Sequence, residues 1–135
     1  MALREVCNGG MALSESPLMT AGGLVRLTYG LGSLFAPRFV AGRYAAAEPD
    51  SVMNLRGFGG QHIAIAVFTV FSSRSTRLAR PAVLLNLGVE VCDAAVGALE
   101  VRERGTHDQI AMGALVLPFI NLATWLSALR RLDRA

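Results

Sequence analysis

Three ionisable side chains lie inside long apolar stretches of this sequence and are its candidates for catalysis: His62, Glu90 and Asp93. An imidazole exchanges its proton near neutral pH, and a carboxyl group among apolar atoms can keep a proton that it would lose in water. His62 and Glu90 could therefore act as a base and an acid. Cys7 and Cys92 lack the paired spacing of a zinc or redox motif, so we expect no metal and no cofactor.

Four apolar stretches, numbered 18–36, 57–73, 81–99 and 110–129, carry these and other polar residues. The hydrocarbon core of a membrane is about 30 Å thick and takes about 20 helical residues to cross. The stretches have this length and lack the alternation of strands. They predict an all-α fold, an integral membrane four-helix bundle.

Start and stop signals set the expected boundaries. We predict a polar leader at 1–16, a four-helix domain at 17–131 and a tail at 132–135, with helices at about 17–36, 52–73, 81–101 and 107–130. Ser16 and Pro17 suit the start of the first helix, and Thr106 with Gln109 has the spacing of a capping box before the fourth.

Composition separates this chain from other classes of protein. Of its 135 residues, 53% are hydrophobic and 17% are charged, whereas an average soluble domain is about 25% charged. The alternative, a soluble four-helix bundle, would need a polar face along each helix, and 110–129 offers few polar side chains. The 13 basic residues are all arginine and are scattered between apolar stretches, which argues against nucleic acid as a partner.

The distribution of arginine predicts the orientation in the membrane. With four crossings, the leader, the 74–80 link and the tail share one side and carry seven arginines, against four on the other side. Arginine is enriched on the cytoplasmic side of membrane proteins. We therefore expect a multi-pass protein of the cytoplasmic (inner) membrane with both termini in the cytoplasm, and Trp125 at the inner interface.

Polar residues inside the stretches repeat at intervals of three or four and should form stripes on single helix faces. Eight of them form a predicted intramembrane network: Arg26, Arg56, Gln61, His62, Asn86, Glu90, Asp93 and Asn121. Ionised groups near the bilayer centre cost about 2.5–3.5 kcal/mol each, so they should pair. From their depths along the helices, we expect Arg26 with Glu90, Arg56 with Asp93, and Asn86 with Asn121.

Several short motifs resemble the small four-helix bacterial membrane proteins of the DoxX-like, DUF4267 and DUF4345 families. They are Arg26 in the first helix, the Leu-Phe-Ala-Pro end at 34–37, Asn-Leu-Arg-Gly at 54–57, and the acids Glu90 and Asp93. The similarity spans Leu24 to Leu129. Many of those relatives carry an acid shortly after the arginine of the second helix, where this chain has Gln61 and His62. The resemblance implies the four-helix topology and, from the DoxX type, a membrane partner of a quinone-linked oxidoreductase.

Two functions follow from these patterns. The network could fix the positions of the helices in a non-catalytic, accessory subunit, homo-oligomeric or bound to another membrane protein. It could instead mark an intramembrane pocket, near His62, Glu90 and Asp93, in a small enzyme or carrier for a lipophilic molecule such as a quinone, isoprenoid or lipid.

Overall fold

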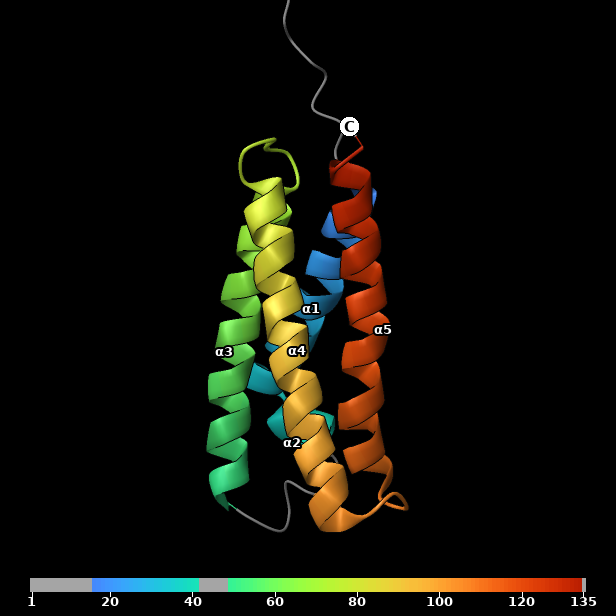
Figure 1. Ribbon diagram of the computed structural model, residues 1–135. Helices are drawn as coiled ribbons and strands as arrows, with labels where there is room; N and C mark the ends of the chain where they lie inside the picture. The colour runs from blue at the N-terminus through green and yellow to red at the C-terminus, as the bar shows by residue number, and fades with distance from the viewer. Residues whose placement is uncertain (1–15, 42–48, 135) are drawn as a thin grey trace, which may run out of the picture.

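The computed structural model describes residues 16–41 and 49–134, which form helices and no strand (Figure 1). The helices are α1 (Pro17–Phe35), α2 (Pro37–Ala41), α3 (Pro49–Ser72), α4 (Ala79–Arg104) and α5 (Gln109–Leu132). The long helices α1, α3, α4 and α5 run side by side, with the start of α1, the 73–78 link and the end of α5 at one end of the bundle. The predicted all-α class is confirmed.

The ends of the helices differ in detail from the prediction. The short α2 was not expected, and most of the predicted leader lies outside the described residues. Helix α4 continues to Arg104, where Gly105 adopts a φ of 86° and its N–H donates to the carbonyl of Val101. The capping box at Thr106 is wrong: the carboxylate of Asp108 accepts the N–H of Ala111 at 3.1 Å, because a short acidic side chain caps a helix as well as threonine does.

The bundle consists of two tightly packed pairs, α1 with α3 and α4 with α5. Gly30 and Gly59 bring α1 and α3 together so closely that a Cβ built on Gly59 would lie 2.7 Å from the carbonyl oxygen of Gly30. A Cβ built on Gly97 would lie 2.4 Å from the carbonyl oxygen of Ala114 in α5. Small residues at these positions let the helix backbones approach each other.

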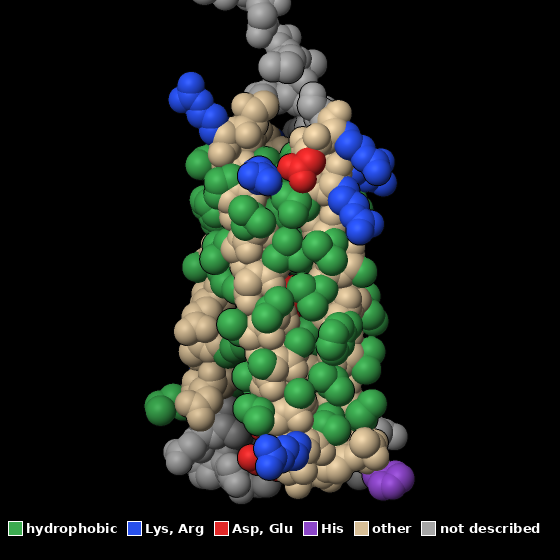
Figure 2. Space-filling model, viewed as in Figure 1, with side chains coloured by type: hydrophobic (Ala, Val, Ile, Leu, Met, Phe, Trp, Pro, Cys, Tyr) green, Lys and Arg blue, Asp and Glu red, His purple; other side chains and the backbone are tan. Residues whose placement is uncertain are grey.

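The outside of the bundle is largely apolar, and its inside holds polar side chains as well as a hydrophobic cluster around Met19, Val83 and Trp125. Buried side chains include Arg26, Glu90, Asn86 and Thr69, whereas many large apolar side chains of all four long helices are exposed. On the face shown in Figure 2, charged side chains gather at the two ends and hydrophobic ones fill the length between them. Trp125 is buried against Gly22 of α1, because Gly22 leaves room for the indole.

Two of the described helical segments, Ala79–Arg104 and Ala111–Leu132, are long and apolar enough to cross a membrane. Each contains an 18-residue window with a mean hydropathy of 1.7. Only 28% of the window in Ala79–Arg104 and 17% of the window in Ala111–Leu132 is buried inside the molecule. Helix α1 carries Arg26 and α3 carries Arg56, Gln61 and His62, and neither helix contains a window that reaches the hydropathy of these two.

Candidate functional site

An ion pair at the centre of the bundle joins α1 to α4. The guanidinium Nη2 of Arg26 donates to Oε1 of Glu90, and the side chains are only 6% and 2% exposed. The pair is the one predicted from the depths of the two residues, and it joins the two tightly packed pairs of helices. Nη1 of Arg26 has no hydrogen-bond partner among the described residues, so the charge of Glu90 is what compensates the buried guanidinium.

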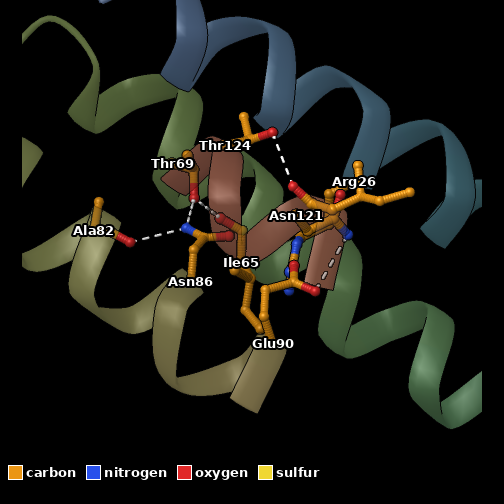
Figure 3. Close-up of polar contacts among 9 residues, drawn as sticks. Arg26, Ile65, Thr69, Ala82, Asn86, Glu90, Asn121 and Thr124 are labelled. Carbon is orange, nitrogen blue, oxygen red and sulfur yellow. Dashed lines mark hydrogen bonds and ion pairs between the residues drawn. The ribbon is translucent and has the colours of Figure 1, made fainter. Parts of the chain in front are cut away.

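The second oxygen of Glu90 holds α5. Nδ2 of Asn121 donates to Oε2 of Glu90 at 3.2 Å, so Arg26 and Asn121 converge on one carboxylate (Figure 3). Three helices thus meet at Glu90. The structure therefore gives Glu90 two strong partners, an arrangement that suits a structural anchor better than a free acid.

The predicted bond between Asn86 and Asn121 is wrong. Nδ2 of Asn86 instead donates to Oγ1 of Thr69 at 2.7 Å and to the carbonyl of Ala82 at 2.8 Å, which joins α4 to α3 (Figure 3). Equal depth did not identify the partner because depth along two helices does not say which faces meet. Thr69 was missed, although Phe58, His62, Ile65 and Thr69 recur at intervals of three and four and form one stripe of α3.

The hydrogen bond between Thr69 and Asn86 should contribute to the stability of the bundle. Thr69→Val removes the hydroxyl and keeps the shape, so we expect the free energy of unfolding in detergent to fall by about 0.6–1.7 kcal/mol. Thr28→Val is the matched control, because the hydroxyl of Thr28 is exposed and bonds only the carbonyl of Leu24 in its own helix. Equal effects of the two substitutions would show that the interhelical bond contributes nothing.

The predicted pairing of Arg56 with Asp93 is also not found. Arg56 is exposed, and no ion pair joins it to Asp93 among the described residues. The inward-facing His62 lies six positions after Arg56, and at about 100° per residue the two side chains point about 120° apart around α3. Asp93 is half-buried one turn along α4 from Glu90.

An open groove of about 540 Å³ lies between α3 and α4. Its walls are mainly apolar and its polar lining residues are Gln61, His62 and Asp93, three members of the predicted network. The exposed Leu84, Leu85 and other α4 residues border it. The groove exists because α3 packs mainly on α1, and α4 on α5, so that the α3–α4 contact is loose.

His62 is the least satisfied polar group of the groove. Its side chain is only 7% exposed, and neither ring nitrogen has a hydrogen-bond partner among the described residues. Phe58 lies with its ring centroid 4.2 Å from that of His62, and Tyr29 of α1 stands edge-on at 5.4 Å. Sequence patterns did not single out these two aromatic neighbours, although Phe58 lies one turn before His62 on the same helix.

The positions of His62 and Glu90 decide whether they can work together as a base and an acid. His62 and Glu90 do not hydrogen-bond to each other, so the predicted acid and base are not assembled as a pair. Within residues 16–41 and 49–134, no group of three or more His, Cys, Asp or Glu side chains could hold a metal ion. The arrangement fits the binding of a molecule in the groove better than general acid–base catalysis.

No protein-family model, curated protein or solved structure matches this chain.

Proposed function

We propose that this chain is a four-helix integral membrane protein of the cytoplasmic membrane and works as a non-catalytic, accessory subunit. The observation that carries the proposal is an ion pair buried inside the bundle while many large apolar side chains lie exposed on its surface. Water favours the opposite arrangement. Lipid tails favour this one, because they solvate apolar side chains and drive charged ones to pair internally.

The low burial of α4 and α5 supports a lipid environment. A helix of this length and hydropathy in a soluble protein would be mostly buried in the core, whereas most of each apolar window here is outside. Helices α1 and α3 are less apolar, but their charged Arg26 and polar Thr69 face inward. In the proposal they cross the membrane as well, because each is as long as the hydrocarbon core requires.

Arginines at one end of the bundle support the proposed orientation. The end that holds the start of α1, the 73–78 link and the end of α5 carries Arg74, Arg77, Arg80, Arg130, Arg131 and Arg134. Arg80 pairs with Asp133 at 3.3 Å across this end. Because arginine is enriched on the cytoplasmic side, both termini lie in the cytoplasm in this proposal.

Open glycines on the outer faces of the helices support an accessory role. A Cβ built on Gly57 or Gly60 of α3 meets no atom within 4 Å, so these surfaces are unoccupied in the single chain. Exposed glycines allow a neighbouring helix to approach closely. The neighbour is a second copy of this chain or another membrane protein, as the resemblance to DoxX-like chains implies.

A second candidate function is a carrier or enzyme for a lipophilic molecule. The specific observation in its favour is the open groove beside the unpartnered His62.

Cell fractionation tests the proposed function. We expect the protein in the membrane pellet after washing with alkaline carbonate, released only by detergent, because its apolar surface requires lipid. Its particle mass in mild detergent should exceed one chain plus micelle, with a stoichiometric partner or a second copy as the added mass. Recovery in the supernatant without detergent contradicts the membrane location, and a monomer without a partner contradicts the accessory role.

A further inference from the structure

We propose that the groove between α3 and α4 binds an uncharged lipophilic molecule by a hydroxyl or carbonyl head group. This inference rests on the proposed membrane location but not on the accessory role. The groove volume of about 540 Å³ lies within the range of about 300–1,000 Å³ that is typical of sites for small ligands.

The distribution of polarity in the groove matches a molecule with one small polar end. Ile65 of α3 and Leu84, Leu85 and Val89 of α4 provide apolar walls. The polar groups are gathered near the middle of the helices: His62 lies about 20 Å along α3 from Pro49, with Gln61 beside it and Asp93 opposite on α4. An apolar tail would lie along the walls while the head meets these groups.

His62 has buried polar atoms without a partner, as Arg26, Ser33, Ser72 and Asn86 also do, and among these described side chains it is the one that lines the groove. A buried polar group without a hydrogen bond costs about 1–3 kcal/mol, so native proteins rarely leave one unsatisfied. The imidazole of His62 is nine-tenths buried and both nitrogens lack partners within the described part of the chain. A neutral imidazole offers one donor and one acceptor. Both nitrogens are shielded from solvent, so a hydroxyl or carbonyl group reaches them when the imidazole turns toward the groove that it lines.

Depth in the membrane selects the class of ligand. The polar groups lie near the bilayer centre, about 15 Å from either edge of a 30 Å hydrocarbon core. The charged head of a phospholipid would have to leave the interface to reach them, at a large free-energy cost. Asp93 in the groove further disfavours an anion. A molecule with a small uncharged head, which already lies among lipid tails, reaches the site without this cost.

Cys92 provides a reporter inside the groove, because it is exposed and lines it. In a Cys7→Ser background, the protein is reconstituted into phosphatidylcholine vesicles and the rate of Cys92 modification by N-ethylmaleimide is measured. At a concentration of farnesol about ten times its Kd, we expect the rate to fall about tenfold. Farnesene, the hydrocarbon of the same skeleton, and farnesylamine, its cationic counterpart, should protect much less.

Matched variants separate binding in the groove from a general effect on the bilayer. Val116→Cys in a background that carries both Cys7→Ser and Cys92→Ser places the single thiol on the exposed face of α5, and its rate should not respond to farnesol. Gln61→Leu should reduce the protection of Cys92 at least about threefold, because it removes a polar contact with the ligand. Gln61 is exposed, so its substitution does not disturb the core. His62→Leu should abolish protection, and Ser127→Ala on the outer face of α5 should leave it unchanged.

Several results would overturn the inference. They are equal protection by farnesol and farnesene, stronger protection by farnesylamine, or full protection by farnesol in the Gln61→Leu and His62→Leu variants. If His62→Leu fails to fold, the Gln61→Leu variant and the comparison of farnesol with farnesene decide the outcome. A protein that fractionates with membranes but shows no protection refutes this inference alone, whereas recovery in the supernatant refutes the membrane location itself.

Discussion

We expect Glu90→Gln to lower the free energy of unfolding in detergent by about 3–5 kcal/mol, because it leaves Arg26 charged, buried and without its counter-ion. The amide can still bond to Asn121, so the loss reports the missing charge more than the missing contact with α5. The measurement is a titration with sodium dodecyl sulfate, in which the fluorescence of Trp125 reports unfolding. This is the only tryptophan in the sequence, and it is buried against α1.

Two further variants test the cause of this loss. Arg26→Gln combined with Glu90→Gln removes both charges, so the double variant should recover at least half of the stability lost in the single one. Glu100→Gln is the matched control, because it breaks the exposed pair between Glu100 and Arg104. Exposed pairs contribute about 0–1 kcal/mol. A double variant no more stable than Glu90→Gln would show that the two charges do not compensate each other.

We expect Gly97→Ala to lower the free energy of unfolding by about 1–3 kcal/mol, the usual effect of overpacking. The new Cβ would lie 2.4 Å from the carbonyl oxygen and 2.6 Å from the carbonyl carbon of Ala114. These are backbone atoms, so they cannot turn aside as the end of a flexible side chain does. Helices α4 and α5 would have to separate along their whole contact, which the same unfolding titration measures.

Gly88→Ala is the control for this substitution and should change stability in the opposite direction. Gly88 lies in the same helix, but a Cβ built there meets no atom within 4 Å. Alanine in the middle of a helix is favoured over glycine by about 0.5–1 kcal/mol. If Gly88→Ala and Gly97→Ala destabilise the protein equally, close packing of α4 on α5 is not what Gly97 provides.

Helical periodicity identified much of the polar interior from the sequence. The stripes that contain Arg26 and Glu90 are buried, and these two residues form the expected pair. Periodicity succeeds here because a helix fixes which of its own residues share a face. Depth along the helices failed for Arg56, which was paired by depth alone although it is exposed on an outer face of α3.

The sequence by itself determined the helices and the chemistry of their surfaces, since the length and hydropathy of each stretch depend only on neighbouring residues. The tertiary structure decided which surfaces meet. It placed Asn86 against Thr69 and Asn121 against Glu90, buried Trp125 beside Gly22, and left a groove beside His62. The physical reason is that rotation and packing of whole helices are set by the close approach of small residues such as Gly30, Gly59 and Gly97. Contacts between distant parts of the chain, which no local pattern records, decide where those approaches occur.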